Sequence, residues 1–230
     1  MTSRPLHLVI IPDGNRRWAR SRGLNPWKGH EQAIEMFRTI SEWCRTDPRV
    51  SILTVWCFST ENWKRNPREI AMLMRMLEEY LRKERSGFVG KDVRFLHSGR
   101  KDRIPPSLAK LLAEVEEETK RGAGFTLHLA VDYGGKDELL RATKSLCITD
   151  ASTIPPITEE TLRSHFDQPS LPDIDLVIRT SGEMRTSNFF LWQAAFAEWA
   201  FTEKLFPDFM ISDMEEALAA YENRTRRLGS

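Results

Sequence analysis

Three short segments of the sequence combine glycine or serine with charged side chains. They read DGNRRW at 13–18, FSTENWKR at 58–65 and RTSGEMRTSN at 179–188. Arginine suits phosphate oxygens, because its planar guanidinium can donate two parallel hydrogen bonds. The segments are therefore typical of sites for phosphorylated ligands, although each taken alone is more often a solvated surface turn.

The first segment places an acid among groups that bind anions. Gly14 permits a tight turn, and the start of the following helix would present free N–H groups to an anion. Arg16 and Arg17 add fixed positive charge. Asp13 would repel a phosphate unless a cation joined the two, and Mg²⁺ prefers one or two carboxylates together with phosphate oxygens. The segment therefore predicts a magnesium–diphosphate site.

The other two segments supply further polar groups. The second offers a hydroxyl, an amide and a guanidinium, from Ser59, Asn62 and Arg65. The third offers groups that could hold a second diphosphate, from Arg179, Arg185 and Ser187. Two such sites in one short chain suggest two phosphorylated substrates, but these residues alone leave the reaction open.

Each segment follows a run that predicts a buried strand. The strand candidates are 6–11, 52–58, 93–96, 125–131 and 175–178, and helical patterns occupy 31–43, 106–119, 136–145, 158–166 and a long stretch after Pro67. This alternation predicts an α/β fold with a mainly parallel sheet covered on both faces. Ligands bind beyond the carboxyl ends of such strands, so the three segments are expected to converge. No linker interrupts the chain, and residues 1–230 are expected to form one domain.

The long helix after Pro67 has an unusually wide apolar face. One stripe is formed by Ile70, Leu73, Met74, Leu77 and Leu81, with Met72, Met76 and Tyr80 beside it. Such a face can pack on a sheet or line an apolar cavity, and its periodicity does not separate the two.

The bulk composition is typical of an ordinary cytoplasmic protein. Lys and Arg number 34 against 33 Asp and Glu, which argues against a nucleic-acid partner. Cys44, Cys57 and Cys147 lack metal-ligand spacing and are expected to be reduced. The apolar run before Pro12 is too short for a signal peptide or a membrane span. His128, on a predicted buried strand, is expected to be a core histidine.

The same residues carry a family resemblance. The strings HLVIIPDGNRRWA, GH (29–30), FSTENWKR, DYGGK and DLVIRTSGEMRTSNFFLWQAAFAE occur in order between His7 and Gly229. The sequence thereby resembles the undecaprenyl diphosphate synthase family of cis-prenyltransferases. The resemblance implies a homodimer with a six-stranded, mainly parallel sheet and a hydrophobic tunnel. It implies Mg²⁺-dependent condensation of isopentenyl diphosphate with an allylic diphosphate, such as geranyl or farnesyl diphosphate. The products would be a Z-polyprenyl diphosphate and diphosphate, with at most peripheral membrane association through that lipid.

The resemblance also assigns roles to residues. It makes Asp13 essential and a magnesium ligand, with Ser59 and Asn62 in the reacting region. It places the remaining substrate contacts at Gly14, Asn15, Arg16, Arg17, Trp18, His30, Trp63, Arg65, Arg179, Arg185 and Ser187. Glu198 corresponds to an acid near the metal and the partner subunit. Arg227, in an Arg-Leu-Gly end, corresponds to a residue that reaches the partner's site.

The sequence departs from the family pattern at a few places. Pro26 stands where an arginine is usual, so one phosphate contact is lost or passes to Lys28. Asp132 replaces an asparagine. Glu78 and Glu79 fall where the tunnel would deepen, which predicts either a shorter tunnel or two solvated glutamates.

Alternative functions remain at this point. A non-catalytic partner subunit of the same fold is disfavoured by the intact Asp-Gly-Asn loop, and a general phospholigand or nucleic-acid binder by the neutral charge. The aspartate-rich DDxxD motif of all-α prenyltransferases is absent. A head-to-middle condensation, the product length and the allylic primer stay open.

Overall fold

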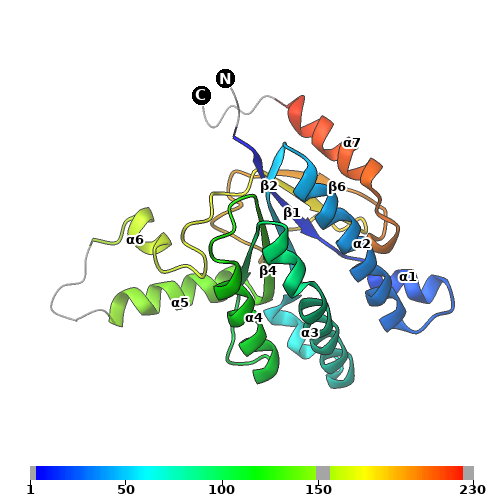
Figure 1. Ribbon diagram of the computed structural model, residues 1–230, viewed down its shortest axis with the longest axis horizontal. Coiled ribbons are helices and arrows are strands. Elements are labelled where there is room, and N and C mark those ends of the chain that lie inside the picture. Colours follow the sequence, from blue (N-terminus) through cyan, green and yellow to red (C-terminus); the bar gives the residue numbers. More distant parts are fainter. Residues whose placement is uncertain (1–3, 149–155, 225–230) are drawn as a thin grey trace.

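The fold is a six-stranded parallel sheet between two layers (Figure 1). The computed structural model describes residues 4–148 and 156–224. The strands are β1 (Leu6–Ile11), β2 (Val50–Ser59), β3 (Val93–Ser98), β4 (Phe125–Tyr133), β5 (Leu176–Arg179) and β6 (Glu198–Phe201). They lie in the order β3-β4-β2-β1-β5-β6, and every neighbouring pair is parallel. The expected sheet is thus confirmed.

Helices follow every strand except β5, which irregular chain joins to β6. They are α1 (Asn15–Ser21), α2 (Pro26–Thr46), α3 (Pro67–Gly90), α4 (Pro106–Thr119), α5 (Gly135–Ile148), α6 (Glu159–Arg163) and α7 (Ile211–Glu222), with 3₁₀ turns η1 (Thr60–Lys64) and η2 (Phe206–Asp208). Proline occupies the first turn of α2, α3 and α4, where its missing N–H costs no intrahelical hydrogen bond. In the described residues no helix combines the length and apolar composition needed to cross a membrane.

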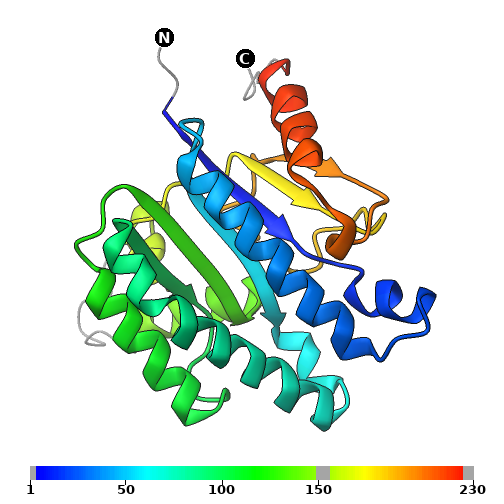
Figure 2. The ribbon, with the colours of Figure 1, turned by 45° about the vertical axis from the view of Figure 1, so that its right-hand side comes forward.

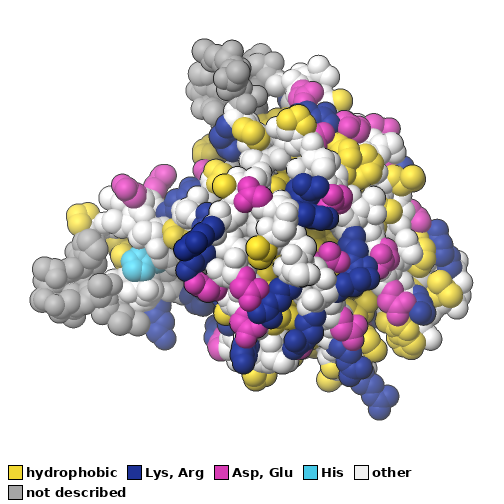
Figure 3. All heavy atoms as spheres, viewed as in Figure 1, with side chains coloured by type: hydrophobic (Ala, Val, Ile, Leu, Met, Phe, Trp, Pro, Cys, Tyr) yellow, Lys and Arg dark blue, Asp and Glu magenta, His cyan; other side chains and the backbone are white. Residues whose placement is uncertain are grey.

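The central strands are buried on both faces, as continuous apolar runs in parallel sheets predict. In β1, Leu8 and Ile10 face one core, and Val9 and Ile11 face another. Helices α2, α3, α4 and α7 cover the first face (Figure 2). The second face is covered largely by irregular chain around Ile174 and 189–194, rather than by helices alone. On the surface, Figure 3 shows basic and acidic side chains interspersed over one face, so an anion must be bound by local geometry.

The sheet order reverses beside β1, because β2 pairs with one side of it and β5 with the other. Such a switch point leaves a crevice at the carboxyl ends of the strands. There Ile11 pairs with Arg179, so the segments after β1 and β5 leave the sheet side by side.

Candidate active site

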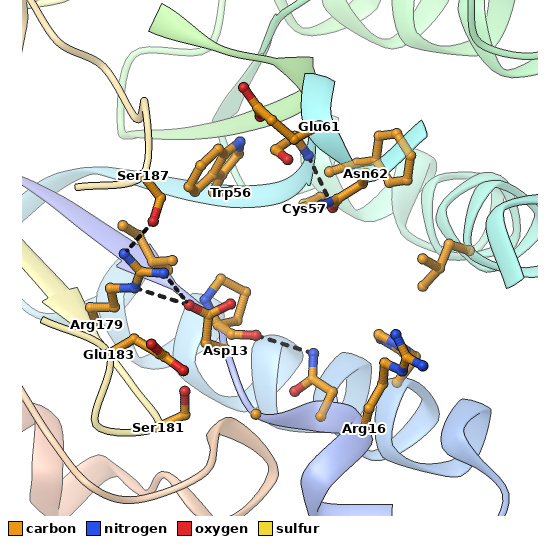
Figure 4. A pocket seen from close by; sticks show the side chains of 18 of the residues that line it. Asp13, Arg16, Trp56, Cys57, Glu61, Asn62, Arg179, Ser181, Glu183 and Ser187 are labelled. Atoms are coloured by element: carbon orange, nitrogen blue, oxygen red, sulfur yellow. Dashed lines mark hydrogen bonds and ion pairs between the residues drawn. The ribbon is translucent and has the colours of Figure 1, made fainter. Parts of the chain in front are cut away.

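A cavity of about 570 Å³ lies at this switch point (Figure 4). It brings together residues from all three charged segments and from α2. Of the residues predicted from the sequence, it is lined by Asp13, Gly14, Asn15, Arg16, Arg17, His30, Ser59, Asn62, Arg65, Arg179, Arg185 and Ser187. The convergence expected from the strand order is therefore what the structure shows.

Arg179 joins the first segment to the third. Its Nε and Nη2 donate to Oδ2 of Asp13 at 2.9 and 2.7 Å. Its Nη1 donates to Ser187 Oγ at 2.9 Å and to the Arg185 carbonyl oxygen. Arg179 is buried, whereas 38% of the Asp13 side chain is exposed. Asp13 thus offers the cavity a carboxylate whose Oδ1 accepts no hydrogen bond from the described residues.

Two glycines allow the backbone to pack tightly around this aspartate. Gly14 has a φ of +100°, and a Cβ there would lie 2.8 Å from Leu205 Cδ2. A Cβ on Gly29 would lie 1.9 Å from the backbone oxygen of Asn15, so only glycine lets α2 approach α1 this closely. That approach brings His30, the next residue of α2, to the cavity wall.

Several buried polar atoms of the cavity wall have no hydrogen-bond partner. They are Asn15 Oδ1, Arg16 Nε, His30 Nε2 and Ser181 Oγ, four of the eight such side-chain atoms found in the described residues. Unpaired buried polar groups are costly and therefore rare. Burial, with Arg65 and Arg16 nearby, lowers the pKa of His30 to about 4, so its ring is neutral at pH 7. These groups are available to a polar ligand.

Two glutamates that the sequence reasoning did not assign lie between the arginines. Glu183 contacts Arg17 at 3.5 Å and also pairs with Arg185. Glu69 lies 3.6 Å from Arg16 and 3.7 Å from Arg65. Each stands four residues or fewer from an arginine of a charged segment, which is the signal that could have identified them. They neutralise the arginines while no anion is bound.

A smaller apolar cavity of about 90 Å³ continues from the polar one. Both are lined by Pro12, Asn15, His30, Cys57 and Leu73. The remaining wall comes mainly from α2 and α3, through Ile34, Phe37, Met76, Leu77 and Tyr80 among others. A polar cradle therefore opens directly into an apolar channel.

Glu78 and Glu79, which the sequence suggested could shorten the tunnel, do not line this channel. Glu78 accepts hydrogen bonds from Arg82 at 2.6 Å and from Ser107 at 2.9 Å, and Glu79 is exposed. The idea that these two residues shorten the tunnel is wrong, because their side chains point away from it. Pro26 begins α2, and Lys28 pairs with Glu31 at 2.7 Å outside the cavity, so Lys28 does not replace the usual arginine.

Neither Trp18 nor Trp63 is among the residues that line the cavity. Trp18 donates to Asp208 at 2.7 Å. Trp63 donates to Oδ1 of Asp132 at 2.8 Å, and Arg103 donates to Oδ2 of the same carboxylate at 2.8 Å. In this arrangement both indoles anchor loops beside the cavity, and their predicted contact with substrate stays a prediction.

Glu198 lies at the wrong end of the sheet to share an ion with Asp13 in one protomer. In the β5–β6 register it pairs with Leu176, whereas Phe201 pairs with Arg179. Glu198 and Phe201 are three residues apart along β6, so Glu198 lies about 10 Å along the strand from the end that carries Arg179. Glu198 instead pairs with Arg224 at 2.6 Å. Arg227 lies outside the described residues.

No group of three or more His, Cys, Asp or Glu side chains in 4–148 and 156–224 is arranged to hold a metal ion. A cation here would have to be shared with its ligand, as Mg²⁺ often is with phosphates.

Comparison with known proteins decides the class of the site. A prenyltransferase family model described as "Putative undecaprenyl diphosphate synthase" matches residues 11–229. The chain belongs to the undecaprenyl diphosphate synthase family. An isoprenyl transferase of Treponema pallidum is 44% identical over 225 residues, spanning 97% of this chain and 98% of that protein. One from Thermotoga maritima is 42% identical over 227 residues, spanning 98% and 97%.

Solved structures of relatives support the same family assignment. Lavandulyl diphosphate synthase from Lavandula x intermedia, in complex with dimethylallyl diphosphate, gives a TM-score of 0.93 at 35% identity over 99% of both chains. A probable undecaprenyl diphosphate synthase from Campylobacter jejuni gives 0.82 at 30% identity over the full length of both. The cavity is therefore the candidate active site of a prenyltransferase.

Proposed function

We propose that this protein is a Mg²⁺-dependent cis-prenyltransferase. It would condense isopentenyl diphosphate with an allylic diphosphate, releasing diphosphate and forming a Z double bond. The supporting observation is the direct junction between the arginine-lined polar cavity and the apolar channel at Asn15 and His30. A prenyl diphosphate has the same two parts, an anionic head and an apolar tail.

The reaction breaks the allylic C–O bond, and its electron pair leaves with the diphosphate. The alkene of isopentenyl diphosphate then forms the new C–C bond, and a proton is lost from that second substrate. Arg16, Arg17 and Arg65 are placed to stabilise the charge that grows on the leaving group. Fixing both substrates also removes much of the entropic barrier, because they no longer need to meet by diffusion.

The second diphosphate fits the third segment. Arg185 and Ser187 line the cavity beside Arg179, whose guanidinium already aligns the Ser187 hydroxyl. Ser59 and Asn62 lie across the cavity at the end of β2, where the Ser59 N–H donates to Asn62 Oδ1 at 3.3 Å. In this proposal they orient the reacting groups between the two diphosphates.

Asp13 fits a magnesium ion shared with the substrate. Its Oδ1 accepts no hydrogen bond from the described residues, and arginines that would accompany phosphate oxygens surround it. When bound, Mg²⁺ would stabilise the negative charge of the departing diphosphate. Arg179 holds the carboxylate in its orientation through two hydrogen bonds to Oδ2.

We also propose a homodimer that buries the exposed edge strand β6. Trp199 and Phe201 stack at 5.7 Å there, and Phe196 and Phe201 are 72% and 39% exposed. An exposed apolar edge strand invites pairing with another chain. In such a dimer, Glu198 and Arg227 would act at or near the partner's site.

The experiment that tests the enzyme proposal compares Asp13→Asn with the natural protein. Incorporation of labelled isopentenyl diphosphate would be measured across a Mg²⁺ titration and with EDTA. The proposal expects incorporation that depends on Mg²⁺ and falls at least 100-fold in the variant. A folded protein that incorporates no label with any allylic primer would favour the non-catalytic partner subunit.

A further inference from the structure

A second, larger chamber lies behind the apolar channel, between α2 and α3. Its volume is about 240 Å³, against about 90 Å³ for the channel. Among the described residues, Tyr80 is the one that lines both. The two spaces are therefore separated at the side chain of Tyr80.

The Tyr80 ring is held firmly in this position. It is 5% exposed and packs on Phe37, with 5.2 Å between ring centroids. The Arg38 guanidinium lies 5.7 Å from the ring centroid, and its Nε donates to Glu84 at 2.9 Å. Phe37 lines the channel and Arg38 lines the second chamber, so consecutive residues of α2 support Tyr80 on its two sides.

The floor beneath the partition is continuous. Leu129 lines the channel, while Leu127 and Phe125 line the second chamber. Alternate residues of a strand point to the same face, so these three form one apolar strip along β4. All three are buried in the same core cluster. Only the space above this strip is divided, and the divider is Tyr80.

The second chamber suits an apolar chain better than an anion. Its inner wall includes Phe88 and Val93. The cations at its mouth are already paired, since Arg45 and Lys91 contact Glu42 at 2.6 and 2.9 Å. An incoming anion would have to displace Glu42 from both cations.

We propose that Tyr80 sets the length of the product by closing the channel before the second chamber. The inference rests on the proposed prenyl-elongating function. An allylic chain grows by five carbons at each condensation, and growth stops when its end meets the ring. Without the ring, the chain end would continue over Leu127 into the second chamber.

The test is the product length of Tyr80→Ala, with labelled isopentenyl diphosphate and geranyl or farnesyl diphosphate as primer. Products should lengthen by at least one five-carbon unit relative to the natural protein. Tyr80→Phe keeps the ring and should leave the length unchanged. Tyr80→Leu, which retains more apolar contact in case alanine impairs folding, should lengthen the product as well.

A matched pair tests the route through the chamber. Gly87 lines the second chamber, and a Cβ on it would meet nothing within 4 Å. Gly87→Phe should therefore fill the chamber, restoring the short product in the Tyr80→Ala background and changing nothing in the natural protein. Unchanged product lengths in folded, active Tyr80→Ala and Tyr80→Leu would overturn the inference.

Failure of the proposed function would look different, because the natural protein itself would form no product. A binding measurement would then still test the inference. Geranylgeranyl thiodiphosphate, an analogue that resists ionisation, should bind Tyr80→Ala at least tenfold more tightly than the natural protein in calorimetry. Equal affinities for the two proteins would count against the partition regardless of turnover.

Discussion

Arg179 donates two hydrogen bonds to a single oxygen of Asp13, at 2.9 and 2.7 Å. The pair links the ends of β1 and β5 and leaves the other carboxylate oxygen toward the cavity. In the proposed reaction, this contact would orient two residues. Asp13 would share Mg²⁺ with one diphosphate, and Arg179 would bind the other diphosphate.

Replacing Arg179 by lysine should therefore damage catalysis more than its unchanged charge suggests. Lysine is a point charge and cannot reach Asp13, Ser187 and the Arg185 carbonyl together. We expect kcat/KM for isopentenyl diphosphate to fall by about 100-fold. Arg75→Lys, on the exposed face of α3, serves as the control in steady-state kinetics. Equal values for both variants would contradict the bridging role.

The Gly14 turn should tolerate no side chain. Gly14→Ala combines a φ of +100° with contacts of 2.8 Å to Leu205 and 3.0 Å to Ser181. We expect a loss of about 2 kcal/mol in the free energy of unfolding. Gly23→Ala is the matched control, because Gly23 has a φ of +67° with nothing within 4 Å. Urea titrations should show a clearly smaller loss there, and equal losses would mean that crowding plays no part.

The buried histidines should make the protein acid-sensitive. Burial lowers the pKa of His7 and of His97 to about 4, and lowers that of His128 as well. The unfolded chain protonates histidine near pH 6.5. It therefore binds protons first as the pH falls, so stability is full above about pH 6.5 and declines toward pH 4.

We expect each of His7 and His97 to lower the free energy of unfolding by up to about 2 kcal/mol between pH 7 and pH 5. Glu138 acts in the opposite direction, because burial raises its pKa. Urea unfolding at pH 7, 6 and 5 measures the sum. A free energy of unfolding that does not fall between pH 7 and pH 5 would contradict the prediction that the histidines outweigh Glu138.

The β6 edge should control self-association. Phe196→Ser together with Phe201→Ser removes apolar side chains that are 72% and 39% exposed. We expect the double variant to sediment as a monomer at concentrations where the natural protein is dimeric. Val89→Ser, at a 57% exposed site near the end of α3, should leave the dimer intact. A dimer that survives the double variant would place the interface elsewhere.

The features predictable from the sequence are those that local chemistry dictates. The buried runs of β1 and β2 and the proline that begins α3 predicted elements that the structure confirms within a few residues. The convergence of the segments that carry Asp13 and Arg179 was predictable, because both lie at the carboxyl ends of parallel strands, whereas their direct hydrogen bonds were not predicted. His128 is the core histidine expected, hydrogen-bonded to Thr54 and Ser98.

Other features depend on packing that no local pattern encodes. The four residues of β6 are half exposed at a sheet edge and carry no buried run. Trp63 belonged to a recognisable motif, yet its indole points back to Asp132. Tyr80 was one apolar residue among many on α3, and its place between two cavities follows from the approach of α2.

The most direct measurement of the central claim is product analysis with the purified protein. It would be incubated with Mg²⁺, ¹³C-labelled isopentenyl diphosphate and, separately, dimethylallyl, geranyl and farnesyl diphosphates. The account predicts linear, butanol-extractable prenyl products whose new double bonds are Z by NMR. Products with E bonds, or branched products from head-to-middle condensation, would contradict it.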